Sequence, residues 1–423
     1  MSKITTLRGM NDLPPEEVRV WNLAEETIQK VFNSYGYEEI RFPIVEKTEL
    51  FTRSNESADV VTKEMYTFED KGGDSISLRP EGTAGCVRAA IDNDLIRIDS
   101  PRLWYQGPMF RYERPQKGRS RQFQQSSAEV FGIRSAEIDA ELIILSSRIW
   151  RELGVEGSLN LEINNLGDEK TRNSYAKSLQ DYFEDFKKDL DEESIRKLDE
   201  NPLRILDSKS ESVQNLLKDA PDISDFISKD SEKEFDELTL LLDSAGIDFS
   251  INQRLVRGLD YYNQTVYEWK TDLLGAQDTV CGGGRYDNLV EELGGKSCPA
   301  TGFSIGMERL ILLMNETLDL SVENENIYLF FVCLSKESIQ KAIMYSESLR
   351  EKVSELGIKI NMGLEGAGSQ FKKADKSGAA FALILGDDEL KNNTISMKDL
   401  RSKSDQETLS YEDLEKRIKK TYK

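Results

Sequence analysis

The strongest constraint on the fold is a pair of strand-like segments separated by a short basic loop. Residues 102–113 read RLWYQGPMFRYE and residues 122–132 read QFQQSSAEVFG, so that only residues 114–121 lie between them. Strands joined by so short a connection pair as antiparallel neighbours, whereas parallel strands need a crossover of a dozen or more residues. The sequence therefore predicts an antiparallel sheet in this part of the chain.

Further helices and strands are expected on both sides of this hairpin. A helix is expected over residues 15–35, because tandem prolines open it and Gly36 closes it. Residues 38–46 look like one strand, whose internal Pro43 favours an edge or interface position. The next elements expected along the chain are a strand, turn and helix over residues 75–91, an amphipathic helix over 136–154 and a strand over 159–165.

The length and the pattern of the chain suggest several units. A chain of 423 residues is too long to fold around one ordinary hydrophobic core. Since domains typically have about 100 to 200 residues, we expect two to four units. Residues 168–248 are charged and helix-forming, so they are expected to be a helical insertion in a core made of residues 1–167 and 249–320. After a boundary near residues 315–326, apolar strands alternate with helices and predict a small α/β domain over residues 325–423.

Histidine is absent from the sequence, and this absence excludes several catalytic chemistries. A Ser-His-Asp triad, an HExxH zinc site and an imidazole general base are all impossible without it. Reactions that depend on positioning and on neutralising charge, such as nucleotidyl or phosphoryl transfer, fit the remaining side chains best. The formal net charge of −21 argues against a nonspecific coat for nucleic acid but does not exclude a local basic site.

The cysteines and the apolar segments indicate the compartment. The four cysteines lie far apart without a CxxC pair, so neither a zinc site nor a disulfide framework is expected, and they are interpreted as reduced thiols: Cys86, Cys281, Cys298 and Cys333. No apolar run approaches the ~20 residues that a bilayer span requires. The first residues also lack the basic and then apolar pattern of a signal peptide. We expect a cytoplasmic protein that does not bind a membrane.

The basic loop and its flanks concentrate five cations in an acidic chain: Arg111, Arg114, Lys117, Arg119 and Arg121. Such a charge run is often only a solvated loop, and this interpretation stays open. Pro115 and Gly118 give the loop defined turn chemistry, which favours an ordered binding site. Tyr112 and Phe123 offer flat faces for a base, and Glu113 adds an acceptor among the cations. The combination favours a polyphosphate nucleotide, or an RNA end, above a sheet.

The segments LRPEGT at residues 78–83 and GFSIGMERL at residues 302–310 hold further candidates. Thr83 is either the N-cap of a helix or a hydroxyl that contacts a ligand, with Glu81 accepting from an α-ammonium group. Arg309 opens an apolar helix and could bind a phosphate. Glycines also cluster at residues 282–284 and 294–295. These runs match neither a P-loop nor GxGxxG, so they are interpreted as positions where strands approach closely.

The segment RGLDYYNQTVYE at residues 257–268 is richer in candidates. Arg257 precedes a glycine turn. Tyr261 and Tyr262 are expected on a strand and therefore on opposite faces, so that at most one of them lines a given pocket. Tyrosines are also ordinary strand formers, and that interpretation stays open.

In this order and spacing, the motifs resemble the class II aminoacyl-tRNA synthetases, and within them the bacterial histidyl-tRNA synthetase family. The resemblance runs essentially end to end. It is carried by RGMNDLPP at residues 8–15, YGYEEIRFPIVE at 35–46 as motif 1, LRPEGT, FRYERPQKGRSRQF at 110–123 as motif 2, LVRGLDYYNQTVYEW at 255–269 as a histidine-specific signature, and GFSIGMERL as motif 3. It implies an α+β fold in which helices flank an antiparallel sheet, with a helical insertion and a C-terminal α/β anticodon-binding domain.

The resemblance also implies an activity and roles for residues. A homodimeric ligase would activate L-histidine with ATP and Mg²⁺ to histidyl-adenylate and then transfer it to the 3′ end of tRNA(His). The nucleotide would be held by Arg111 and Arg257 at the α-phosphate, Glu113 and Phe123 at the adenine and Arg309 at the γ-phosphate. Histidine would be bound by Glu81, Thr83, Gln125, Glu129, Tyr261 and Tyr262. The tRNA would approach Arg114, Gln116, Lys117 and Arg119. No protein side chain is expected to hold a metal.

Glu129 and Tyr262 suit an imidazole on physical grounds as well. A neutral imidazole has one N–H donor and one lone-pair acceptor, so a specific pocket needs an acceptor opposite the first and a hydroxyl opposite the second. Two positions depart from the usual family pattern. Ser120 stands where a tyrosine is usual, and Gln124 stands where a histidine is usual.

Two other functions stay open. A regulatory paralogue that binds histidine without charging tRNA typically lacks the C-terminal domain and the motif arginines. Here Arg111, Arg257, Arg309 and residues 325–423 are all present. A tRNA-binding protein without catalysis would show no histidine-dependent exchange between ATP and pyrophosphate.

Overall fold

The structure is a computed structural model that describes residues 3–53, 55, 58–98, 100–208, 210–275, 278–320, 328–402 and 404–421. The chain divides into two compact units, Met1–Leu320 and Ser321–Lys423, called here the first and second unit. Within the described residues, no helix is long and apolar enough to cross a membrane.

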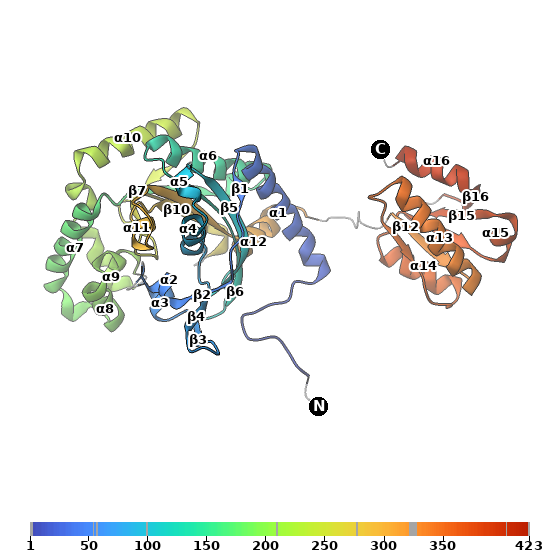
Figure 1. The fold of residues 1–423 in the computed structure, drawn as a ribbon, viewed down its shortest axis with the longest axis horizontal. Coiled ribbons are helices and arrows are strands. Elements are labelled where there is room, and N and C mark those ends of the chain that lie inside the picture. The colour runs from blue at the N-terminus through green and yellow to red at the C-terminus, as the bar shows by residue number, and fades with distance from the viewer. Residues whose placement is uncertain are drawn as a thin grey trace. The chain divides into compact units, whose positions relative to one another are not determined.

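An eight-stranded sheet forms the centre of the first unit (Figure 1). Its strands, in spatial order, are β1 (Glu38–Glu39), β5 (Arg102–Phe110), β6 (Gln122–Phe131), β11 (Ala300–Gly306), β10 (Thr279–Arg285), β9 (Asn263–Lys270), β7 (Asn160–Asn165) and β8 (Ser250–Ile251). All neighbours are antiparallel except the two outermost pairs, β1 with β5 and β7 with β8, which are parallel. The antiparallel hairpin predicted on either side of the basic loop is confirmed as β5 and β6.

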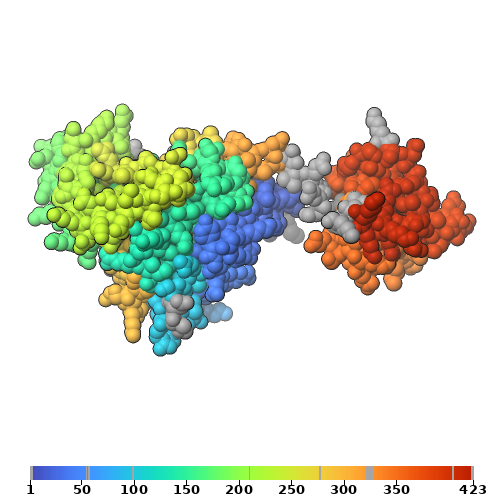
Figure 2. Space-filling view, turned by 90° about the horizontal axis from the view of Figure 1, so that it is seen from above, coloured from blue at the N-terminus to red at the C-terminus, as the bar shows by residue number. Residues whose placement is uncertain are grey.

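Side chains alternate along each strand, so the sheet has two faces of different character. On one face, Ala128 and Val130 of β6 join the core formed with four helices: α1 (Pro15–Ser34), α6 (Ala136–Glu152), α10 (Lys229–Ser244) and α12 (Met307–Thr317). Figure 2 shows α6 and α10 side by side on this unit. On the opposite face, Tyr105 of β5 and Phe131 of β6 pack in a second core. The candidate residue Glu129 lies between Ala128 and Val130 and therefore belongs to this second face.

The strand predicted over residues 38–46 is wrong as a single element. Residues 38–39 form β1, and the chain then crosses to a three-stranded sheet of β2 (Val45–Lys47), β4 (Ser75–Leu78) and β3 (Tyr66–Glu69). Pro43 lies in the crossing, where its missing N–H removes no sheet hydrogen bond. The short helices of this region are α2 (Thr48–Thr52), α3 (Asp59–Thr62), α4 (Thr83–Asp92), α5 (Leu95–Ile98) and α11 (Leu289–Glu292).

In the segment expected to be helical, the described residues from Glu169 to Ser244 form α-helices and 3₁₀ turns joined by short loops, without a strand. Its further elements are α7 (Glu169–Glu184), α8 (Glu192–Glu200) and α9 (Glu211–Leu216), which Figure 1 draws in green. Side chains cap the starts of α7, α8 and α10: those of Asp168, Asp191 and Ser228 accept from the backbone N–H groups of Thr171 (2.7 Å), Ser194 (2.8 Å) and Ser231 (3.3 Å). The 3₁₀ turns of the first unit are η1 (Glu156–Ser158), η2 (Lys187–Asp189), η3 (Pro202–Asp207), η4 (Leu217–Asp219), η5 (Ile223–Phe226) and η6 (Asp272–Leu274).

The second unit is an α/β domain around a five-stranded sheet. In spatial order its strands are β13 (Ile358–Ile360), β12 (Leu329–Cys333), β14 (Phe381–Leu385), β15 (Thr394–Asp399) and β16 (Glu407–Ser410). Its helices are α13 (Lys336–Lys352), α14 (Ala367–Lys376), α15 (Asp387–Asn392) and α16 (Tyr411–Thr421). The predicted alternation of strands and helices is confirmed, but the sequence did not reveal β16 or α16, because both are rich in polar side chains.

Candidate active site

The basic loop between β5 and β6 is an ordered turn. Gln116 and Arg119 exchange backbone N–H···O hydrogen bonds of 3.0 and 2.9 Å across Lys117 and Gly118. Gly118 has φ +73°, a left-handed conformation that glycine adopts without strain. The turn chemistry predicted from Gly118 is therefore confirmed, and it weighs against a merely solvated loop.

Four arginines from separate segments converge beside this turn. Arg111 follows β5, Arg119 lies in the loop, Arg257 precedes β9, and Arg309 lies in the first turn of α12. All four line both of two adjoining cavities, which have volumes of about 170 and 1140 Å³. The junction between the cavities thus concentrates positive charge in a chain whose net charge is −21.

The electrostatics of Arg309 show that this cluster is crowded with cations. Burial, followed by the charges of Arg119 and Arg111, lowers the pKa of Arg309 below its ordinary value. Its guanidinium donates to the carbonyl oxygens of Thr279 (2.6 Å) and Gly118 (3.3 Å), so it also braces the turn. A polyphosphate at this place would relieve the mutual repulsion of the arginines.

The smaller cavity offers an aromatic face and polar groups. Arg111 lies over the ring of Phe123, 5.1 Å from its centroid. Oε1 of Gln125 is buried and has no hydrogen-bond partner among the described residues, so an acceptor is available to a ligand. Glu113 pairs with Arg119 and lies 3.8 Å from Nη1 of Arg111. Burial raises the pKa of Glu308, another wall residue, to about 7.

Glu129 lines neither cavity and lies in a cluster of hydroxyl groups. Its Oε1 accepts from Thr83 Oγ1 and Tyr105 Oη, both at 2.9 Å, and its Oε2 accepts from Tyr286 Oη. Burial raises its pKa to about 8, although the three hydroxyl donors act in the opposite direction. Gly302 lies opposite Glu129 on β11, and any side chain there would overlap its carboxylate. Glu129 is thus a shielded acceptor at the site face of the sheet.

Glu81, and not Thr83, caps helix α4. Its carboxylate accepts from the backbone N–H groups of Thr83 (2.6 Å) and Ala84 (2.9 Å), while Gly82 occupies the N-cap position. The interpretation of Thr83 as an N-cap is therefore wrong. The hydroxyl of Thr83 is used for Glu129 instead. Since a carboxylate has about four lone-pair positions, Glu81 retains acceptor capacity for an ammonium group.

The expectation that Tyr261 and Tyr262 point to opposite faces of a strand is wrong. Strand β9 begins at Asn263, so both tyrosines lie in the turn before it and strand alternation does not apply. Their ring centroids are 4.8 Å apart, and both rings contact Tyr286 at 5.6 and 6.2 Å. The Tyr261 hydroxyl lies 3.5 Å from Oε2 of Glu81. The aromatic cluster therefore adjoins both buried carboxylates.

The residues expected to meet tRNA have different surroundings. Arg114 and Gln116 are exposed, and Gln116 lines the larger cavity. Lys117 forms an ion pair of 2.8 Å with Glu316 of α12. Ser120, one of the two unusual residues, accepts a long hydrogen bond of 3.4 Å from Asn11. The other, Gln124, donates its backbone N–H to Glu308 at 3.0 Å.

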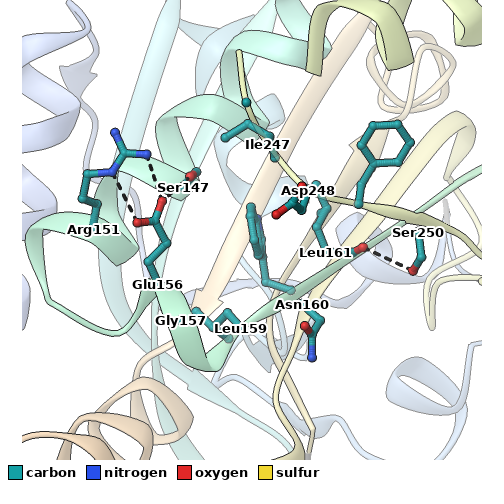
Figure 3. A pocket seen from close by; sticks show the side chains of 13 residues that line it. Ser147, Arg151, Glu156, Gly157, Leu159, Asn160, Leu161, Ile247, Asp248 and Ser250 are labelled. Carbon is teal, nitrogen blue, oxygen red and sulfur yellow. Dashed lines mark hydrogen bonds and ion pairs between the residues drawn. The ribbon is translucent and has the colours of Figure 1, made fainter. Parts of the chain in front are cut away.

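Another cavity, of about 730 Å³, lies beside β7 and β8 and is shown in Figure 3. Its cation Arg151 is already paired with Glu156 at 2.9 Å. The indole N–H of Trp269 donates to Ser146 at 2.8 Å. None of the candidate residues from the motifs lies on its wall, so we assign the chemistry to the arginine-lined cavities.

Three residues of this site were not identified from the sequence: Tyr105, Glu268 and Tyr286. Tyr105 and Tyr286 donate to Glu129, and Glu268 pairs with Arg257. A signal existed for Glu268, because it lies in the same motif as Arg257. Tyr105 lies on β5 and Tyr286 directly follows β10, so the two are far apart in sequence, and no local pattern relates them to Glu129. The four cysteines are buried and free, as expected.

The first unit has an antiparallel sheet flanked by helices. A strand-loop-strand element and the start of a helix bring arginines to one pocket. This combination defines a class II aminoacyl-tRNA synthetase. Residues 9–310 match the family model for histidyl-tRNA synthetase, and residues 329–421 match that for an anticodon-binding domain. The chain belongs to the histidyl-tRNA synthetase family, and its activity is that of an aminoacyl-tRNA ligase. The resemblance found in the motifs is confirmed.

Solved structures agree with this assignment. Apo histidyl-tRNA synthetase from S. aureus shares 34% identity over 99% of this chain and 100% of that chain, with a TM-score of 0.82. Histidyl-tRNA synthetase from Nostoc sp. shares 25% identity over 100% of both chains, with a TM-score of 0.70. A protein from Bacillus halodurans described as an ATP phosphoribosyltransferase regulatory subunit/histidyl-tRNA synthetase shares the fold at 20% identity, covering 88% of this chain and 97% of that chain, with a TM-score of 0.63.

Proposed function

We propose that the arginine-lined junction binds the triphosphate of ATP and that the Glu129 cluster binds histidine. The convergence of Arg111, Arg119, Arg257 and Arg309 on two adjoining cavities is the observation that carries this proposal. Guanidinium groups match phosphate oxygens in geometry and charge, and a partly buried site strengthens these contacts.

The reaction needs no side chain that accepts a proton. The histidine carboxylate attacks the α-phosphorus, pyrophosphate leaves, and the product is histidyl-adenylate. Arg111 and Arg257 neutralise the charge that develops on the α-phosphate, and Arg309 binds the leaving end. The terminal ribose hydroxyl of tRNA(His) then attacks the carbonyl carbon, AMP leaves, and a phosphate oxygen of the leaving AMP takes the proton of the hydroxyl. A chain without histidine can therefore carry out both steps.

Histidine selection follows from paired polar groups. Glu129 accepts the imidazole N–H, and the Tyr262 hydroxyl meets the other ring nitrogen. Glu81, Thr83 and Gln125 receive the α-amino group, and Tyr261 packs beside them. An apolar amino acid would leave these buried groups without partners, which costs about 1 to 3 kcal/mol for each group.

The nucleotide would bring Mg²⁺ with it. Mg²⁺ bound through substrate phosphates needs one or two carboxylates from the protein. Glu308 lines the smaller cavity, so one carboxylate is present that would complete the coordination of such an ion, in contrast to the expectation from the sequence that no side chain holds a metal. The adenine would lie between Phe123 and Glu113.

The partners follow from the same assignment. Arg114, Gln116, Lys117 and Arg119 would approach the acceptor end of tRNA, and the second unit would bind the anticodon. A homodimer would form through motif 1, where Ile44 and Val45 leave 40 and 42% of their surface exposed. We expect the enzyme in the cytoplasm, where translation uses its product. The regulatory alternative is less well supported, because the motif arginines and the anticodon-binding domain are both present.

Histidine-dependent exchange between ATP and pyrophosphate tests this proposal directly. Arg257→Ala should reduce the exchange rate roughly 100- to 1000-fold, the usual loss when a donor to the transition state is removed. Arg102→Ala is the matched control, because Arg102 pairs with Glu141 (3.1 Å) and lines neither cavity. Exchange within a few-fold of the parent in Arg257→Ala would refute the assigned role.

A further inference from the structure

The guanidinium of Arg257 lies against β10, where a glycine leaves room for it. Gly282 of β10 pairs in register with Glu268 of β9. A side chain at position 282 would overlap three atoms of the Arg257 guanidinium. The missing side chain therefore leaves room beside Glu268, and Nη1 of Arg257 forms an ion pair with Oε1 of Glu268 in that room.

Glu268 is itself held by a network that leaves it little freedom. Thr279 Oγ1 donates to its Oε2 at 3.0 Å, and Lys270 Nζ lies 3.4 Å from the same oxygen. Lys270 also pairs with Glu162 at 2.9 Å, on the strand opposite Glu268. Only 12% of the Glu268 side chain is exposed. A carboxylate fixed from two sides can determine the orientation of the guanidinium that it binds.

Arg257 lies on the walls of the cavities and keeps N–H groups that Glu268 does not use. Nε of Arg257 is buried and has no hydrogen-bond partner among the described residues. Arg257 lines both cavities, whereas Glu268 lines only the larger of the two. Burial opposes the charge of Arg257, but Glu268 raises the pKa of Arg257 above its ordinary value. The arginine is thus charged, binds Glu268 through Nη1 and lies 5.7 Å from the ring centroid of Tyr262, and its remaining N–H groups leave donor capacity for a phosphate.

We propose that Glu268 is a positioning residue that holds the guanidinium of Arg257 in the orientation required for transfer at the α-phosphate. This inference rests on the role proposed above for Arg257. Glu268 does not touch the substrate; it acts through Arg257, and Thr279 and Lys270 hold Glu268 in turn. Orientation of a donor that acts mainly in the transition state affects kcat more than ground-state affinity.

Glu268→Gln tests the proposal in the full-length enzyme, because it keeps the size of the side chain and removes its charge. The kcat of histidine-dependent pyrophosphate exchange should fall roughly 10- to 100-fold, the loss expected for a charge-assisted hydrogen bond. The KM for ATP should change less than threefold. Glu268→Asp, which retains the charge, should recover part of the loss. Glu156→Gln is the matched control, since Glu156 also pairs with an arginine, Arg151 (2.9 Å), but lines neither cavity, and its kcat should stay within a few-fold of the parent.

The double variant separates this proposal from the proposed function. If Glu268 acts through Arg257, adding Glu268→Gln to Arg257→Ala should cause no further loss, because the two residues work as one unit. Losses that multiply would overturn the positioning role, and so would an unchanged kcat in Glu268→Gln. If Arg257→Ala itself retains full exchange, the role proposed for Arg257 fails instead.

Discussion

Replacing Glu129 by glutamine should stabilise the first unit, and more so as the pH rises. The pKa of Glu129 is raised to about 8 by burial, against an ordinary value of 4.5. A carboxyl group with a raised folded pKa destabilises the fold wherever it would be ionised in the unfolded chain. Its cost is absent below pH 4.5 and complete above pH 8.

The magnitude follows from the same two values. At 1.36 kcal/mol per pH unit, the cost of Glu129 is about 2 kcal/mol at pH 6 and about 5 kcal/mol at pH 9. Glutamine has no such cost, and the hydroxyls of Thr83, Tyr105 and Tyr286 can reorient to donate or accept. The free energy of unfolding of the variant, relative to the parent, should therefore rise by about 3 kcal/mol between these two pH values.

Urea unfolding followed by tryptophan fluorescence measures this difference. All four tryptophans lie in the first unit, so the signal reports that unit alone: Trp21, Trp104, Trp150 and Trp269. Glu291→Gln, at an exposed glutamate on α11, is the control and should show the same stability relative to the parent at both pH values. The reasoning is refuted if Glu129→Gln also keeps one constant difference from the parent at pH 6 and pH 9. The same variant should bind histidine more weakly, because the carboxyl group that destabilises the fold is also the proposed acceptor for the imidazole N–H.

Three further predictions concern assembly and geometry. Light scattering at micromolar concentration should give twice the chain mass of 48.2 kDa, and a monomeric mass would exclude the proposed homodimer. Deleting residues 321–423 should reduce tRNA charging much more than pyrophosphate exchange; equal losses in a folded truncated protein would contradict the division of roles. Gly282→Ala should displace Arg257 and reduce exchange on the order of 100-fold with little change in stability, whereas Gly157→Ala, which meets open space, should not.

The elements predicted from the sequence are those with local signals. The helix expected over residues 15–35 is α1, because the tandem prolines and Gly36 act within a few residues of its ends. The hairpin of β5 and β6 follows from the shortness of its loop. The prediction of one strand over residues 38–46 was wrong, because the chain passes from one sheet to another at Pro43. Where such a passage occurs depends on the neighbouring strands.

The sequence predicted which residues belong to the site, but it did not predict the contacts between them. Composition excluded histidine chemistry, and the motifs brought Arg111, Arg257 and Arg309 into one interpretation. The partners of Glu129 and the pairing of Arg257 with Glu268 could not be read in the same way. They depend on the register of β9 with β10 and of β6 with β11, which sets opposite each other residues that are distant in the chain.

The sequence by itself determined the chemistry available to this protein, the order of its motifs and the family to which it belongs. These depend on which side chains are present and on their spacing along the chain. Tertiary structure alone decided that Tyr261 and Tyr262 lie together, that Glu81 caps α4, and that Gly282 and Gly302 leave room for Arg257 and Glu129. The physical reason is that burial and contact between distant segments arise only when the sheet is assembled, and no local pattern encodes the distance between two atoms on different strands.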